Sequence, residues 1–204
     1  MLHYLTAGEL ARRPDLAHEM FRDRARQFHD RLGWDVTVEE GGLERDQYDV
    51  PAAHYVIWAP EGRHLGSMRF MPTTGPTMVN DHFAHLAGRT LSHPGLVECT
   101  RFCVSPGAPA SAAACMMFGA LDYGIAAGFD AIVGVFDARM LRIYARLGWA
   151  PVLLGSDGAG RDRISSGLWS VDPLLRPRLM EAAGILEEDA DLWVRRLARR
   201  PRRG

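Results

Sequence analysis

The stretch that decides the fold runs from residue 97 to 136 and reads VECTRFCVSPGAPASAAACMMFGALDYGIAAGFDAIVGVF. Its two ends, 97–104 and 131–136, are rich in aliphatic and aromatic residues and are typical of buried strands. Between them, residues 110–127 form an apolar helix of mostly small residues, which Gly128 ends. A strand, a helix and a second strand in this order predict two parallel strands with the helix packed beside them.

The segments on either side of this unit predict the rest of a mixed sheet. Two strand-like runs at 54–59 and 64–72 are joined by the turn Pro60-Glu61-Gly62-Arg63 and should form an antiparallel hairpin. The other expected elements are a first strand at 1–6, a helix at 14–32, an irregular crossing loop at 35–50, a short helix at 81–86, a helix at 138–147, strands at 152–154 and 164–171, and two closing helices. This order predicts one domain over 1–204, of the α/β (α+β) class, with a mostly antiparallel sheet flanked by helices; it is compatible with the acetyltransferase-like (GNAT-like) fold.

Composition limits the class of protein. The chain has 204 residues, 47% of them hydrophobic, and a formal net charge of −1, which gives no reason to expect nucleic acid or an anionic membrane as a partner. Its longest apolar run, 112–121, is too short to cross a bilayer, and its three cysteines show no Cys-x-x-Cys spacing. We therefore expect a cytoplasmic protein without a metal site. All 24 basic residues are arginine, and several form a basic tail at 195–204.

Charged side chains stand among aromatic residues in four blocks. The blocks are Arg24 with Phe28 and Trp34, the run 44–49 (ERDQYD), the run 66–69 (GSMR) and the run 98–102 (ECTRF). Two of them lie on predicted buried strands. Burial of an ion there is unfavourable in free energy unless an opposite charge, from another side chain or from a ligand, pairs with it. This pattern is typical of an active site. From the residues alone, Glu98 is either a general base or half of a structural ion pair with Arg69 or Arg101.

The order of these motifs resembles the LuxI-type acyl-homoserine lactone synthases, the autoinducer synthases of bacterial quorum sensing. The residues that carry the resemblance are Arg24, Phe28, Trp34, Asp46-Gln47-Tyr48-Asp49, Gly66-Ser67-Met68-Arg69, Phe83 and Glu98-x-x-Arg101-Phe102. The resemblance implies an acyltransferase that joins S-adenosylmethionine to a fatty acyl group. The acyl group would arrive as a thioester on acyl carrier protein or coenzyme A, and methylthioadenosine would be released. S-adenosylmethionine is then a substrate, and no cofactor is expected.

The resemblance also implies roles for individual residues. The S-adenosylmethionine pocket would consist of Arg24, Phe28, Trp34 and Phe83, and the catalytic ionic network beside it of Glu98, Asp46, Arg101, Arg69 and Asp49. Glu98, helped by Asp46, is the expected base. The expected acyl-chain pocket consists of Phe102, Met116, Met117, Leu121, Val133, Gly134, Phe136 and Trp149. Gly134 stands where members that use 3-oxo chains tend to carry a hydroxyl, which favours unsubstituted, 3-hydroxy or long chains here.

Two alternatives stay open at this point. The first is an acetyl-CoA-dependent small-molecule N-acetyltransferase of the same fold, although residues 105–111 lack the Arg-x-x-Gly-x-Gly/Ala loop that holds a pyrophosphate in that class. The second is a sensor that binds an adenosyl ligand without turnover.

Overall fold

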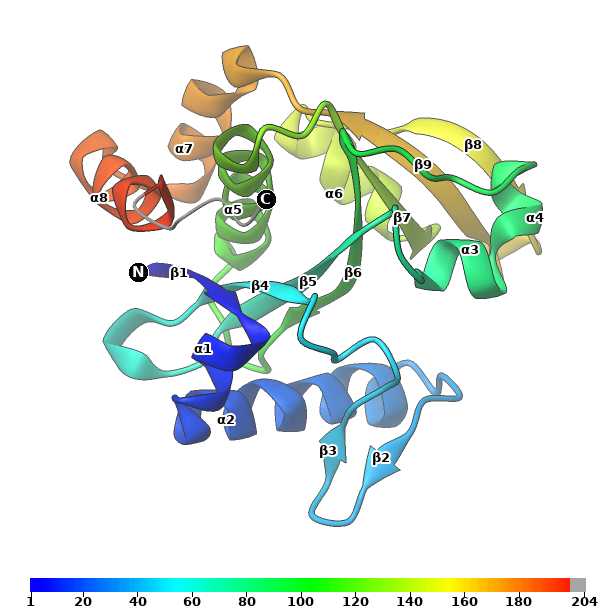
Figure 1. Ribbon diagram of the computed structural model, residues 1–204, viewed down its shortest axis with the longest axis horizontal. Helices are drawn as coiled ribbons and strands as arrows, with labels where there is room; N and C mark the ends of the chain where they lie inside the picture. The colour runs from blue at the N-terminus through cyan, green and yellow to red at the C-terminus, as the bar shows by residue number, and fades with distance from the viewer. Residues whose placement is uncertain (199–204) are drawn as a thin grey trace.

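A single seven-stranded sheet organises the protein, whose computed structural model describes residues 1–198 (Figure 1). The strand order is β1-β4-β5-β6-β7-β9-β8. The strands are β1 (Leu2–Thr6), β4 (His54–Trp58), β5 (Gly66–Pro72), β6 (Leu96–Val104), β7 (Ala131–Asp137), β8 (Val152–Asp157) and β9 (Ile164–Ser170). Only β6 and β7 pair in parallel in this sheet, and its other neighbours are antiparallel. The predicted mixed, mostly antiparallel sheet is therefore confirmed.

Helices cover both faces of the sheet (Figure 1). They are α1 (Ala7–Ala11), α2 (Pro14–Arg24) with its π-helical continuation η1 (Ala25–Arg31), α3 (Met78–His82), α4 (Ala84–Ala87), α5 (Ala112–Ala127), α6 (Met140–Leu147), α7 (Arg176–Ala183) and α8 (Glu187–Ala198). Three 3-10 turns are η2 (Pro60–Gly62), η3 (Gly160–Asp162) and η4 (Pro173–Leu175). Helix α5 packs on β4 and β5, and α7 and α8 pack on α5, while α2 lies on the opposite face of the sheet (Figure 1).

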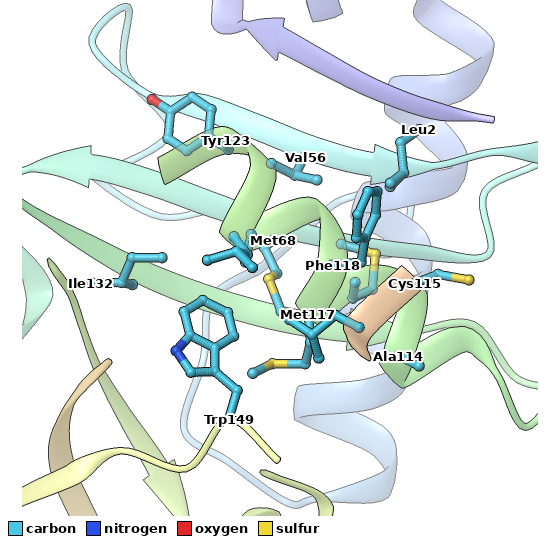
Figure 2. Close-up of a cluster of buried hydrophobic side chains, with 14 of the residues drawn as sticks. Leu2, Val56, Met68, Ala114, Cys115, Met117, Phe118, Tyr123, Ile132 and Trp149 are labelled. Atoms are coloured by element: carbon cyan, nitrogen blue, oxygen red, sulfur yellow. The ribbon is translucent and has the colours of Figure 1, made fainter. Parts of the chain in front are cut away.

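The small residues of α5 let it approach the sheet closely. A Cβ built on Gly119 would lie 2.7 Å from Val56 Cγ1 and 3.1 Å from Leu2 Cδ2, so any larger residue would push the helix away. Gly128 ends the helix in the left-handed conformation with φ of 76°, as predicted. Figure 2 shows Phe118 and Met117 of this helix among the buried side chains of the main core.

The structure differs from the sequence-based expectation in the crossing loop. Residues 35–50 contain a small hairpin, β2 (Val38–Glu39) and β3 (Leu43–Glu44), where we expected irregular chain. Gly41 and Gly42, with φ of 95° and 76°, supply the turn that joins the two short strands. The short helix expected at 81–86 is divided into α3 and α4.

Two further expectations concern the membrane and the tail. Among the helices of residues 1–198, none combines the length and the apolar character that a membrane crossing requires. Of the basic tail predicted at 195–204, residues 199–204 lie outside the described part of the chain.

The sheet opens between its two parallel strands. Pairing of β6 with β7 ends at Glu98 and Val133, while β6 stays paired with β5 up to Val104 and β7 stays paired with β9 up to Asp137. The two strands therefore diverge after Glu98 and leave a gap through the sheet.

A β-bulge stands at the same place. Arg101 and Phe102 oppose the single residue Met68, and Arg101 has a φ of 54°. Such backbone is unfavourable for a side chain with a Cβ, and strained residues and bulges of this kind are over-represented at active sites. The bulge reorients β6 at the level where the gap begins.

Candidate active site

One cavity lies on the α5 side of the gap and is mainly apolar. Its walls come from β5, β6, β7, α5, α6 and Trp169 of β9, and across the gap from η1 and the residues that follow it. Met68, Met117, Ile132 and Trp149 of this set are visible in Figure 2. The lining residues on this side of the sheet are Met68, Cys99, Phe102, Met117, Ala120, Ile132, Gly134, Phe136, Met140, Tyr144, Trp149 and Trp169. Hydrocarbon is the natural content of such a pocket.

A second cavity lies on the other side of the gap, and its lining includes the charged side chains of Asp35, Asp46 and Arg101. It is lined by Trp34, Asp35, Val36, Thr37, Asp46, Gln47, Tyr48, Met78, His82, Phe83, Arg101, Val135, Phe136 and Ile164. Five of these residues also line the first cavity, namely Trp34, Met78, Arg101, Val135 and Phe136. The two cavities therefore meet at the bulge of β6, and together they form one cleft that passes through the sheet.

Arg24 anchors the buried part of an ionic network behind this cleft. Its Nε donates to Glu44 Oε2 at 2.5 Å, and its two terminal nitrogens donate to the carboxylate of Asp49 at 2.9 and 3.0 Å. The side chains of Arg24 and Glu44 are 1% and 0% exposed. Because every nitrogen of this guanidinium faces a protein carboxylate, Arg24 ties α2 to β3 and to the loop after it.

Two further arginines continue the network to the cleft. Arg69 of β5 binds both oxygens of Asp46, approaches Asp49 at 3.0 Å and donates from Nε to the Thr100 hydroxyl at 3.1 Å. Arg101 binds Glu44 at 2.9 Å and Asp46 at 2.8 Å. Asp46 and Arg101 line the second cavity, so the network reaches the cleft surface through these two side chains.

The arginines keep the aspartates charged. Burial alone would raise the pKa of Asp49, but the charges of Arg24 and Arg69 outweigh burial and hold that pKa well below its usual range. For Asp46, burial is likewise outweighed by the hydrogen bond and charge of Arg69 and by Arg101, and its pKa is lowered. Both carboxylates are therefore anionic at neutral pH, and Asp46 offers that charge to the cleft.

Glu98 is the exception among the acids. It is 1% exposed, and its carboxylate accepts hydrogen bonds from the backbone N–H groups of Met78 at 3.1 Å and Val79 at 2.5 Å. Burial raises the pKa of Glu98 to about 7 in spite of these two hydrogen bonds and the charge of Arg69. The carboxyl group lies directly behind Met78, which lines both cavities, and can exchange a proton near neutral pH.

Phe28 and Trp34 form a stacked aromatic surface against which a cation can bind. The rings of Phe28 and Trp34 stack with centroids 5.3 Å apart, and the guanidinium of Arg101 lies 5.5 Å from the centre of the Phe28 ring. The π-helical turns of η1 and the left-handed Gly33, with φ of 64°, bring Trp34 back onto Phe28. Trp34 is 37% exposed, so its part of this aromatic surface is accessible to a ligand.

Most of the predicted site residues lie together at the cleft, but several occupy positions that differ from the predicted ones. Phe28, Trp34 and Phe83 line the cleft, whereas Arg24 stands behind it. Phe102, Met117, Gly134, Phe136 and Trp149 line the apolar cavity.

Met116, Leu121 and Val133 do not line the apolar cavity, contrary to our prediction. Met116 turns toward β5, where its sulfur would lie 2.9 Å from a Cβ on Gly66, and Leu121 is fully buried in the same core. Val133 alternates with the cavity-lining Ile132 and Gly134 and packs with Val79 on the opposite face of the sheet.

Sequence reasoning named the run 44–49 but missed Glu44 and the two tyrosines that complete the network. Glu44 forms salt bridges with both Arg24 and Arg101. The Tyr48 hydroxyl donates a hydrogen bond to Asp81 at 2.8 Å, and the Tyr55 hydroxyl donates one to Asp49 at 2.8 Å. Tyr55 stands opposite Arg69 in the β4–β5 register, so the hairpin alternation contained the signal for it.

Glu98→Gln is expected to change how stability depends on pH. The raised pKa, from 4.5 to about 7, means that the folded protein holds the proton more tightly than the unfolded chain. The stabilisation from the protonated carboxyl is therefore lost as pH rises from 4.5 to about 7, by about 3 kcal/mol over this window.

Urea unfolding of both proteins across this pH range measures the effect. The free energy of unfolding of the wild type relative to Glu98→Gln should fall by that amount between the acidic and the basic end. The same difference at both ends would contradict the raised pKa.

Comparisons with known proteins place this site in a family. The model of the autoinducer synthase family matches residues 9–166. An acyl-homoserine-lactone synthase of Rhizobium etli is 37% identical over 180 residues, which cover 84% of each chain, and one of Rhizobium radiobacter is 36% identical over 67% of this chain and 69% of its own.

Solved structures agree with this placement. The CoA-dependent acyl-homoserine lactone synthase MesI superimposes with a TM-score of 0.82 at 26% identity, over 91% of this chain and 96% of its own. The match to the family model covers the strand–helix–strand unit and all of the ionic network. The chain belongs to the autoinducer synthase family.

Proposed function

We propose that this protein is an acyl-homoserine-lactone synthase that acylates the amino group of S-adenosylmethionine and then closes the lactone. The observation that carries the proposal is the meeting of two unlike cavities at Arg101. One is lined by ions and aromatic rings and the other by hydrocarbon, and the split between β6 and β7 joins them. A charged nucleophile and an apolar acyl chain can therefore meet inside one cleft.

The second cavity suits S-adenosylmethionine, which carries a sulfonium, an ammonium and a carboxylate. The aromatic faces of Trp34, on which Phe28 stacks, and of Phe83 attract the cationic centre, and the anionic Asp46 holds the ammonium. Arg101 is the arginine of the network that lines the cleft, and it receives the carboxylate. Arg24 and Arg69 keep Asp46 and Asp49 in place from behind.

The first chemical step is removal of a proton from the ammonium. Glu98 is the base, because its pKa of about 7 lies near the working pH and near that of the substrate amine. Since Glu98 does not line the cavity, the proton reaches it through a water molecule beside Met78.

The free amine then attacks the thioester carbonyl, and the tetrahedral intermediate expels the thiol of the donor. Where β6 and β7 diverge, backbone N–H groups are no longer paired between these two strands, and they can donate hydrogen bonds to the oxyanion. In the last step, a carboxylate oxygen of the new amide attacks the carbon bonded to the sulfonium, so that the C–O bond of the lactone forms as the C–S bond breaks. The electron pair of the C–S bond leaves with methylthioadenosine, so the sulfonium becomes a neutral thioether. For this step the cleft supplies orientation.

The acyl donor is a thioester of acyl carrier protein or of coenzyme A. The related MesI is described as CoA-dependent, which supports coenzyme A as one carrier. Both donors belong to the cytoplasm, the location we propose for this protein. S-adenosylmethionine is consumed, so the chemistry requires no additional cofactor.

Incubation of the purified protein with S-adenosylmethionine and a panel of acyl-carrier-protein and acyl-CoA donors tests the function. Mass spectrometry should detect acyl-homoserine lactones and methylthioadenosine in equal amounts. N-acetylated amines made from acetyl-CoA without methylthioadenosine would instead indicate an acetyltransferase, and tight binding of S-adenosylmethionine without any product would indicate a sensor. Either result would overturn the proposal.

Gly134→Val is expected to close the passage for the acyl chain. A Cβ at this position would lie 3.0 Å from Cys99 O across the gap and 3.5 Å from the Trp169 ring. The added methyl groups would occupy space that the acyl chain needs where it crosses the gap, so we expect kcat/KM for acyl donors to fall by about tenfold, which corresponds to about 1.4 kcal/mol.

The matched control is Gly8→Val, because a Cβ on Gly8 meets nothing within 4 Å. Steady-state kinetics with donors of increasing length should show the loss in Gly134→Val alone. Equal kcat/KM values for Gly134→Val and the wild type would show that the chain does not pass this point.

A further inference from the structure

The apolar cavity contains a buried tyrosine that the reaction described above does not use. Tyr144 of α6 is 5% exposed and lines the cavity together with Phe136 and Trp169. Its ring meets both of them edge-on, with centroids 5.3 and 5.0 Å apart. These contacts fix the ring and, with it, the direction of the hydroxyl.

The other buried polar side chains of this cavity are satisfied within the protein. Thr100 accepts a hydrogen bond from Arg69 Nε at 3.1 Å. Trp149 donates from its indole nitrogen to Ser170 O at 3.0 Å, and Trp169 donates to Trp149 O at 3.2 Å. By contrast, the Tyr144 hydroxyl forms no hydrogen bond with any side chain or backbone group of residues 1–193.

A hydroxyl in a cavity without a protein partner can hydrogen bond to a ligand oxygen, and such a bond contributes about 0.5–1.5 kcal/mol. The hydroxyl keeps its proton, because burial, followed by the charges of Cys99 and Asp137, raises the pKa of Tyr144 far above its usual range. Cys99 and Asp137 line the cavity from β6 and β7. Tyr144 therefore lines the cavity together with residues of the two strands that border the gap.

We propose that Tyr144 determines acyl specificity by hydrogen bonding to an oxygen on the acyl chain close to the thioester. This inference rests on the proposed function and narrows its substrate class to oxygen-bearing acyl groups, such as 3-hydroxy or 3-oxo chains. A phenol both donates and accepts, so either substituent can pair with it. Gly134 offers no side-chain donor, which leaves this recognition to α6.

Tyr144→Phe tests the proposal, because it removes the hydroxyl and keeps the ring that packs on Phe136 and Trp169. Its matched control is Tyr4→Phe, which removes another buried, unpartnered hydroxyl that lies outside the cavity. The measurement is kcat/KM for unsubstituted, 3-hydroxy and 3-oxo acyl thioesters of one chain length on one carrier.

We expect the wild type and Tyr4→Phe to prefer an oxygen-bearing chain by about tenfold or more, the value of one buried hydrogen bond. In Tyr144→Phe this ratio should fall to about one. Lactone formation with the same ratio in Tyr144→Phe and the wild type would overturn the inference alone. Absence of lactone from every donor would overturn the proposed function, and the inference with it.

Discussion

Glu98→Gln is expected to lower the rate of lactone formation by about 10³-fold, within the range that a positioned general base contributes. The amide keeps one acceptor oxygen for the N–H groups of Met78 and Val79, which bind separate carboxylate oxygens in the wild type, and it cannot take a proton. A circular dichroism spectrum like that of the wild type will show that the fold persists. Single-turnover kinetics with saturating substrates measures the chemical step itself.

The pH dependence distinguishes loss of a base from a general disturbance of the cleft. The wild-type rate should rise through pH 7 as Glu98 loses its proton. In the variant, the residual rate should instead follow the substrate amine, whose pKa is about 8. Glu40→Gln, at the exposed tip of the β2–β3 hairpin, is the matched control and should behave like the wild type. A variant with near-normal rates would remove Glu98 from the mechanism.

Arg24→Met is expected to destabilise the protein by about 3–5 kcal/mol in the absence of any substrate, because it leaves buried carboxylates without their partner. Glu44 and Asp49 are 0% and 7% exposed, so water cannot replace the guanidinium. Guanidinium chloride unfolding measures this loss.

The matched control is Arg26→Met, two residues along the chain. Arg26 is 49% exposed and pairs with Asp23 at 3.2 Å, and exposed pairs of this kind contribute at most about 1 kcal/mol. If Arg24→Met unfolded like the wild type and only its KM for S-adenosylmethionine rose, Arg24 would be a substrate clamp, as the sequence suggested, and not a structural anchor.

The case of Arg24 shows how far the sequence could predict the site. The resemblance identified the ionic residues, and the strand–helix–strand pattern from 97 to 136 predicted the parallel pair around which they gather. Which acid pairs with which arginine depends on distances within the folded chain. Sequence spacing therefore could not show that Arg24 faces Glu44 and Asp49 instead of the cleft.

The acyl pocket was harder to predict for a related reason. Helix α5 is apolar on every side, so its sequence does not indicate which face borders a cavity and which borders the sheet. Met116 and Met117 are adjacent in the sequence, yet the first packs on β5 and the second lines the cavity. In β7, strand alternation could have excluded Val133, because Ile132 and Gly134 lie on the face toward α5.

The central claim is that both substrates meet at Arg101, within the gap between β6 and β7. A crystal structure with S-adenosylmethionine and an unreactive acyl thioether analogue measures this most directly. We predict the substrate amine beside Asp46 on one side of the sheet and the acyl chain along Gly134 and Met117 on the other. An acyl chain bound on any outer surface of the sheet, with the gap empty, would contradict the account.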